Sequence, residues 1–216
     1  MSYEPLTIEA DSEAPQVKVN RRTIAKQRTR EKVLEAARTL FIQRGYEGAT
    51  IRDIAQAAGM STGAVFANFA DKSELFDAII KSDLELLHEQ MATAASNAAG
   101  VERALLDMFG AGYRLYLRQL PMVQAIVSAS WTRDQNNETQ HRMALKPLLD
   151  LVQSALQRGV ADGEIAKTVD LSLMLETVWD LYLVNYRRAV FDELGFDQLM
   201  ARLSTQLSML LRGARP

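Results

Sequence analysis

The apolar residues that follow the first thirty positions recur at steps of three and four. This period is carried by Val33, Leu34, Ala37, Leu40 and Phe41. Such spacing places apolar side chains on one face of an α-helix. The pattern stops at Gly45, and glycine readily adopts the left-handed conformation that ends many helices. The sequence therefore predicts an amphipathic helix from Thr29 to about Gly45.

Three capping signals then follow within a short stretch. Thr50 precedes an apolar face, and Asp53 stands at the third helical position, which is the arrangement of a capping box. Gly59 ends this short helix, and Ser61 can cap a second one. Asp71, with a glutamate three residues later, opens a third helix that is much longer. We therefore expect two short helices and one long helix here.

Beyond residue 100 every apolar pattern is helical. The predicted helices cover 101–118, 121 to about 131, about 137–160 and 170–191, and a last helix begins at about 197. Pro147 is expected to kink the third of these. No strand-like alternation is found. The fold class is therefore all-α with about nine helices, arranged as an acidic mobile tail (1–22), a helix-turn-helix domain (23–71) and a helical ligand-binding and dimerisation domain (72–216).

The last two predicted helices carry a large apolar surface. The segment 170–191 is apolar nearly all round, which is typical of a buried helix. The final helix has one apolar stripe, and its dimer-interface candidates are Leu199, Leu203, Leu207 and Leu210. We expect these leucines to pack against a second copy of the chain in a two-fold four-helix interface. The alternative is a purely intramolecular core.

Composition narrows the class of protein. Hydrophobic residues make up 48% of the 216 residues, which suffices for a core without cross-links. The absence of cysteine excludes disulfides and cysteine-based zinc sites, and no metal or cofactor is expected. No apolar run reaches the roughly 20 residues of a membrane span, and the N-terminus lacks the features of a signal peptide. We expect a soluble cytoplasmic protein.

Charge is distributed unevenly along the chain. The formal net charge is −2, but residues 21–52 hold nine basic and three acidic residues. A local basic excess of this kind suits a surface that faces nucleic-acid phosphates. A solvated helix face with ordinary charge is the alternative interpretation.

The segment 50–69 has the layout of a helix-turn-helix. Two short helices are joined by a turn with Gly59 and Ser61, and the small residues Ala55 and Gly63 allow the helices to cross closely. The second helix is then expected to present an exposed face to a DNA major groove. That face consists of Thr62, Ala64, Phe66, Ala67 and Asn68.

With its flanks, this region resembles the DNA-binding domain of the TetR family of transcriptional regulators. The similarity spans residues 30–76 without a gap, and its most specific part is AGMSTGAVFANFADKSELF. The resemblance implies three DNA-binding helices followed by a helical domain that binds a ligand and dimerises. It also implies a homodimer that binds operator DNA, with a small-molecule effector releasing a repressor.

The resemblance also assigns DNA contacts. It implies that the start of the recognition helix lies nearest the bases and that Lys72 touches a phosphate. Thr50 and Arg52 begin the preceding helix, where free N–H groups and the helix dipole favour a phosphate. The full set of expected DNA-binding residues is Arg28, Arg30, Thr50, Arg52, Ser61, Thr62, Gly63, Ala64, Phe66, Asn68 and Lys72.

Several of these assignments remain open. Phe66 replaces a frequent tyrosine of the family, so the phosphate contact of a tyrosine hydroxyl is expected to be missing, and the alternative contact is its ring against a thymine methyl or the sugar backbone. Asn68 has two possible roles: its side chain hydrogen-bonds an adenine edge or a phosphate, or it caps the loop. Arg28 and Arg30 are expected to bind phosphate near the start of the first helix. Arg21 and Arg22 are interpreted as part of a flexible arm that reaches a groove. Two further arginines, Arg38 and Arg44, are interpreted as surface or packing residues.

Aromatic and methionine residues of the C-terminal domain are candidates for a ligand pocket. They are Met108, Tyr113, Tyr116, Trp131, Met143, Met174, Trp179 and Tyr182. The alternative is that they are ordinary core residues, which would leave a DNA-binding protein without a ligand switch. Glu176 and Asp180 either bind a cationic ligand or form a solvated or ion-paired stripe.

A serine hydrolase is the competing function from another class. Residues 59–63 match the G-x-S-x-G pattern of a nucleophile elbow. An elbow requires a strand before the serine, whereas a helical pattern precedes Ser61. The two histidines, His88 and His141, both fall in helical segments. The sequence therefore favours Ser61 as a helix cap.

Overall fold

The structure is a computed structural model, and it describes residues 21–130 and 135–216. In this part of the chain all regular elements are helical. They are α1 (Arg21–Gly48), α2 (Ile51–Ala57), α3 (Thr62–Phe66), α4 (Lys72–Ala95), α5 (Val101–Tyr116), the 3-10 helix η1 (Leu117–Gln119), α6 (Leu120–Ser130), α7 (Gln135–Ala161), α8 (Leu171–Phe191) and α9 (Phe196–Gly213). The all-α prediction is confirmed.

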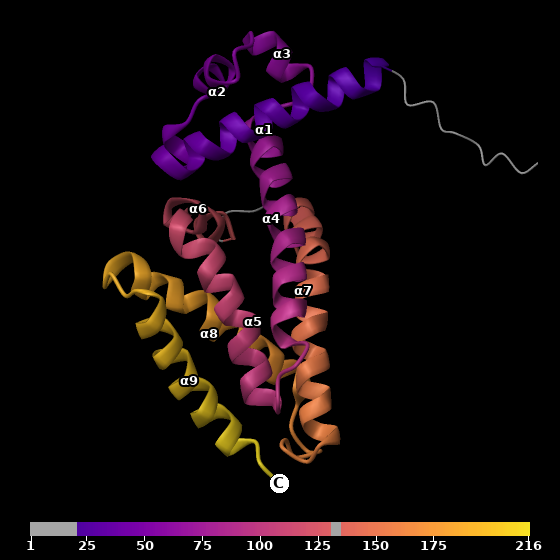
Figure 1. The fold of residues 1–216 in the computed structure, drawn as a ribbon, viewed down its shortest axis with the longest axis vertical. Coiled ribbons are helices and arrows are strands. Elements are labelled where there is room, and N and C mark those ends of the chain that lie inside the picture. The colour runs from indigo at the N-terminus through magenta and orange to yellow at the C-terminus, as the bar shows by residue number, and fades with distance from the viewer. Residues whose placement is uncertain (1–20, 131–134) are drawn as a thin grey trace, which may run out of the picture.

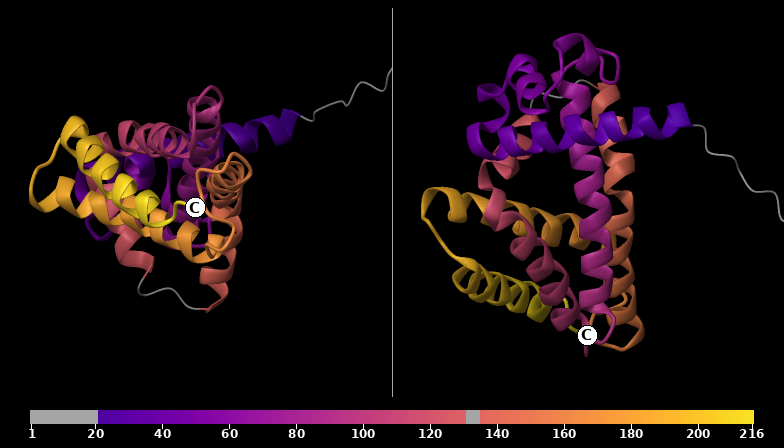
Figure 2. Two further views of the ribbon diagram at one scale, coloured as in Figure 1. Left: turned by 90° about the horizontal axis from the view of Figure 1, so that it is seen from below. Right: turned by 45° about the horizontal axis from the view of Figure 1, so that its top comes forward.

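The helices form a small unit at one end of a longer bundle (Figure 1). Helices α2 and α3 lie over α1, and α4 runs from this unit down the length of the molecule beside α5 and α7. Helices α8 and α9 pack together on the other side of α5, as two further views show (Figure 2). Helix α6 lies between α1 and α8, so it touches both the small unit and the bundle.

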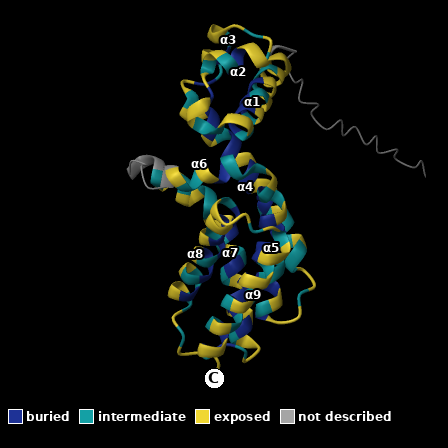
Figure 3. Ribbon diagram, turned by 90° about the vertical axis from the view of Figure 1, so that its left-hand side faces the viewer, coloured by how far each residue is buried: buried dark blue, intermediate teal, exposed yellow. Residues whose placement is uncertain are grey.

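Buried residues follow the inner faces of both parts (Figure 3). In the small unit, Val33, Phe41, Ile54, Val65 and Phe69 are almost fully buried, as their helical spacing predicted. These side chains fix the angle between α1, α2 and α3, because tightly packed side chains leave little room for other arrangements. The core continues without a break along α4 into the bundle.

One helix boundary differs from the expectation. Helix α1 begins at Arg21 rather than Thr29, so Arg21 and Arg22 belong to a helical turn rather than to a flexible arm. Gly45 interrupts the same helix with φ 72°, which agrees with the predicted end there. Helix α7 continues through Pro147 as one element.

The prediction that the leucine stripe of α9 forms the dimer interface is corrected by the structure. Leu199, Leu203 and Leu207 have no exposed surface, and Leu210 is partly buried, all within a single chain. They pack on α5 and α8, where the lack of side chains at Gly110 allows the Met200 side chain to approach closely. The stripe therefore belongs to the intramolecular core. No helix in the described residues is both long and apolar enough to cross a membrane.

Candidate nucleic-acid interface and internal cavity

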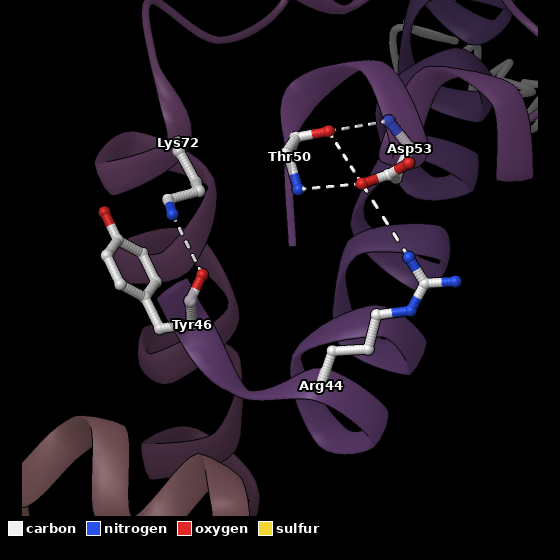
Figure 4. Close-up of polar contacts among 5 residues, drawn as sticks. All are labelled: Arg44, Tyr46, Thr50, Asp53 and Lys72. Atoms are coloured by element: carbon white, nitrogen blue, oxygen red, sulfur yellow. Dashed lines mark hydrogen bonds and ion pairs between the residues drawn. The ribbon is translucent and has the colours of Figure 1, made fainter. Parts of the chain in front are cut away.

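Helix α2 begins with the predicted capping box. The Thr50 hydroxyl accepts a hydrogen bond from the Asp53 amide (3.1 Å), and the Asp53 carboxylate accepts from the Thr50 amide (3.3 Å) and hydroxyl (2.7 Å). The Arg44 guanidinium lies 3.8 Å from the same carboxylate (Figure 4). These hydrogen bonds from Thr50, with Arg44 nearby, lower the pKa of Asp53. The hydrogen bonds between Thr50 and Asp53, both near the surface, therefore fix the start of α2.

Helix α3 is also capped as predicted. The Ser61 hydroxyl accepts a hydrogen bond from the Ala64 amide at 3.2 Å. Gly59 in the preceding turn has φ 67°, a conformation that residues with a Cβ rarely adopt. On the outer face of α3, Thr62 and Gly63 are exposed, and Phe66 exposes 53% of its surface. An exposed phenylalanine on a short capped helix is suited to contact with a partner.

Asn68 and Arg30 form a brace at the end of α3. The Asn68 side-chain amide donates to the Ala64 carbonyl at 2.9 Å, so Asn68 has the loop-capping arrangement in the unbound protein. The Arg30 guanidinium donates to the Asn68 carbonyl at 2.8 Å and lies over the Phe69 ring at 4.0 Å. Arg30 therefore ties α1 to the end of α3 while remaining near the surface.

Lys72 forms a second brace, at the start of α4. Its ammonium donates to the Tyr46 carbonyl at 2.9 Å and lies 4.1 Å from the centre of the Tyr46 ring (Figure 4). The Glu47 carboxylate is 3.8 Å away, and about a quarter of the Lys72 side chain is exposed. Lys72 thus joins α4 to the end of α1, and its phosphate contact stays a prediction.

The remaining cations of the small unit occupy two kinds of environment. Arg28 on α1 and Arg52 on α2 are exposed. Arg38, in contrast, forms an ion pair of 2.5 Å with Asp83 on α4, whose side chain is buried. Burial raises the pKa of Asp83, and the neighbouring Arg38 partly offsets this. Arg38 is therefore a packing residue that links α1 to the bundle.

The bundle contains a cavity of about 480 Å³ between α4, α5, α6, α7 and α8. Its aliphatic lining comes mainly from α4 and α6, through residues such as Leu84 and Val123. Three of the predicted ligand residues line it, namely Tyr116, Trp179 and Tyr182. A cavity of this volume and lining matches the usual size of small-molecule sites.

The other ligand candidates lie elsewhere. Met108, Tyr113 and Met174 are buried core residues that do not line this cavity. Met143 is 70% exposed on α7 and also lies outside it. Trp131 falls outside the described residues. Helical spacing alone does not separate these positions, because every one of them occurs in an apolar period.

Sequence reasoning missed several residues of this region. Tyr186 lines the cavity, and its hydroxyl shares a hydrogen bond of 2.8 Å with Tyr182. The Tyr113 hydroxyl donates to the Tyr182 carbonyl at 3.1 Å. Burial raises the pKa of all three hydroxyls, which therefore stay neutral. Asp83 was also missed, although a carboxylate inside the apolar period of α4 is a visible signal.

The hydrolase interpretation does not fit the geometry. Ser61 follows α2 and a turn, and its hydroxyl is engaged with the Ala64 amide. The described ranges contain no strand that an elbow would need. Ser61 is a helix cap.

Comparisons with known proteins agree with this architecture. The family model described as bacterial regulatory proteins of the tetR family matches residues 33–79. The transcriptional repressor AcnR of Corynebacterium efficiens is 30% identical over 186 residues, which are 83% of this chain and 92% of that protein. The repressor KstR2 of Mycolicibacterium smegmatis is 26% identical over 163 residues, or 73% of this chain and 78% of that protein.

A solved structure shows the same fold. The regulator FadR of Bacillus subtilis, crystallised with stearoyl-CoA, superposes with a TM-score of 0.68 at 21% identity, over 84% of this chain and 96% of that one. The helix-turn-helix, its capped helices and the near full-length similarity to AcnR lead to one conclusion. This chain belongs to the TetR family of transcription regulators.

Proposed function

We propose that this protein is a dimeric repressor whose α3 helices read successive major grooves of an inverted-repeat operator. The observation that carries the proposal is the exposed face of α3, held by the Ser61 cap and by the Arg30 brace. Two recognition helices in a two-fold dimer suit half-sites about 34–36 Å apart. Residues Ser61, Thr62, Gly63 and Ala64 would lie nearest the bases.

Phosphate contacts would come from the exposed positions around α3. Arg52 and Thr50 stand at the start of α2, and Arg28 lies on α1. Positive side chains beside a helix N-terminus attract phosphate through both charge and the free N–H groups. Arg30 and Lys72 would act mainly by holding α1, α3 and α4 in register, because their cations already have partners within the chain.

The cavity in the bundle is the proposed effector site. Helix α6 lines the cavity and also packs on α1, and α4 lines it on the side of the Arg38–Asp83 ion pair. A ligand that fills the cavity would shift α4 and α6, and with them the spacing of the two α3 helices. The coupling between ligand and DNA is typically about 1–3 kcal/mol. The solved complex of the similar FadR with stearoyl-CoA supports a ligand in this fold.

Dimerisation would use the outer faces of α8 and α9. Leu173, Val184 and Phe191 lie on one face of α8 and are between 48% and 68% exposed, and Met209 on α9 is 70% exposed. Large apolar side chains on one face favour an isologous interface between two copies. This face replaces the buried leucine stripe as the proposed interface.

Selection from a pool of random double-stranded oligonucleotides tests the function. The wild-type protein should enrich an inverted repeat. Phe66→Ala should change the preferred half-site or weaken its selection, because Phe66 belongs to the reading face. Leu86→Ala, an equally conservative change on the surface of α4, is the matched control and should select the same repeat. Enrichment of no sequence by the wild type would overturn the proposal.

A further inference from the structure

The Tyr116 hydroxyl differs from the other tyrosine hydroxyls around the cavity. Tyr182 and Tyr186 bond to each other, and Tyr113 bonds to a backbone carbonyl. Tyr116 lines the cavity and is 95% buried, since 5% of its surface is exposed. Its hydroxyl makes no hydrogen bond with any residue that the structure describes. A tyrosine hydroxyl can both donate and accept a hydrogen bond, so this one is available to a ligand in the cavity.

The electrostatic surroundings of Tyr116 disfavour an anion. The buried Asp83 carboxylate lies close enough to raise the pKa of Tyr116, after the larger effect of burial itself. Arg38 acts in the opposite direction but more weakly at this position. A second negative charge beside Tyr116 would meet both the cost of burial and the repulsion of Asp83. The part of the cavity beside Tyr116 therefore suits a neutral polar group.

Among the described residues that line this cavity, the two with a formal charge are both exposed. Asp180 and Arg187 are exposed on α8, seven residues or about 10.5 Å apart along the helix. Because these two side chains carry opposite charges, together they favour neither an anionic nor a cationic ligand. Apart from His141 on α7, the rest of the described lining is aliphatic and aromatic, including Leu84 on α4 and Trp179 on α8. The body of a ligand here would be apolar.

We infer that the effector is a neutral, largely apolar molecule whose hydroxyl or carbonyl group hydrogen-bonds to Tyr116, rather than an anion held by its charge. This inference rests on the proposed role of the cavity as the effector site. It assigns the ligand's polar group to the position beside Tyr116 and its apolar body to the walls formed by α4, α6 and α8.

Isothermal titration calorimetry of the full chain at pH 7 with two matched probes tests this inference. The probes are 4-phenylphenol, which is neutral at this pH, and biphenyl-4-carboxylate, which is an anion. We expect the phenol to bind at least about tenfold more tightly, in line with the cost of burying an unpaired charge. Tyr116→Phe should weaken phenol binding about two- to tenfold and leave the carboxylate unchanged.

Tyr113→Phe is the matched control, because it removes a buried hydroxyl of the same helix that does not line the cavity. It should leave phenol binding unchanged. If Tyr116→Phe proves unstable by circular dichroism, Leu145→Trp, which fills the cavity from α7, should abolish phenol binding instead.

The outcomes distinguish the claim that the cavity is the effector site from the claim that its ligand is neutral. Equal or tighter binding of the carboxylate, or an unchanged phenol affinity in Tyr116→Phe, overturns the neutral ligand class but leaves the cavity as the effector site. Binding of neither probe to the wild type, up to their solubility limits, overturns the effector site and the ligand class together. Failure of operator selection, in contrast, would concern only DNA binding.

Discussion

The helix-turn-helix unit and the C-terminal bundle share one apolar core, but they differ in the contacts that position their helices. In the unit, short helices begin at side-chain caps such as Thr50 and Ser61, and cations on α1 and α4 brace them at the surface. In the bundle, long helices pack through buried apolar and aromatic side chains such as Leu203 and Tyr182. Caps contribute about 1 kcal/mol each, whereas a buried leucine contributes several times more. Substitutions of buried side chains should therefore affect mainly stability, and substitutions of the caps and exposed cations of the unit should affect mainly DNA binding.

The largest expected effect on stability comes from a substitution in the buried leucine stripe of α9. Leu203→Ala should lower the free energy of unfolding by about 2–5 kcal/mol, because Leu203 is fully buried within one chain. Urea denaturation measures this loss. Phe191→Glu is the comparison, since Phe191 is 68% exposed on α8. It should convert the dimer to monomers in light scattering while each chain keeps its helical content. Dissociation by Leu203→Ala without loss of stability would restore the original assignment of the stripe.

This contrast explains what the sequence could predict. Caps are local, so Thr50, Ser61 and Asp71 specify the starts of α2, α3 and α4 from a few neighbouring residues. An apolar stripe such as that of Leu199 and Leu203 looks the same whether it packs on its own chain or on a second copy. Its partner is set by contacts between helices far apart in sequence, which periodicity does not record.

The candidate sites follow the same division. The capping box and the exposed face of α3 were predictable because they depend on local order along the chain. The cavity was predicted only in part, since Tyr116 lines it while Met143, with the same kind of pattern, points to solvent. The ion pair between Arg38 and Asp83 joins residues 45 positions apart, so only the unusual carboxylate on the inner face of α4 could have indicated it.

Close packing in the bundle is tested next at Gly112. A Cβ atom there would overlap the Tyr182 hydroxyl, whose ring is confined by the stacked Phe109 ring. Gly112→Ala should be less stable than Gly110→Ala by about 1–3 kcal/mol, as for other overpacked cores. Both changes raise the helix propensity by the same amount, and a Cβ at Gly110 would contact only the flexible ends of the Met200 and Arg114 side chains. Urea denaturation of the two variants checks the difference, and equal stabilities would show that Tyr182 moves freely.

The cap of α3 should give a smaller effect on stability and a visible effect on DNA binding. Ser61→Ala removes the hydrogen bond to the Ala64 amide, so the free energy of unfolding should fall by about 1 kcal/mol. Operator affinity should fall as well, because α3 frays. Asp170→Ala removes the cap of α8 and is the control, with a similar stability loss and unchanged operator affinity in fluorescence anisotropy. Equal losses of affinity in both variants would contradict a specific role of the α3 cap.

The smallest expected effect on stability, and the most specific effect on DNA binding, belongs to Arg52. Its side chain is exposed at the start of α2, so Arg52→Ala should leave unfolding nearly unchanged. If each Arg52 neutralises one phosphate, the slope of log affinity against log salt should become shallower by about 0.9 per subunit, or about 1.8 for a dimer. Arg188→Ala on α8, also exposed, is the control and should keep the wild-type slope. An unchanged slope in Arg52→Ala would remove α2 from the phosphate contacts and leave DNA recognition to α3 and α1.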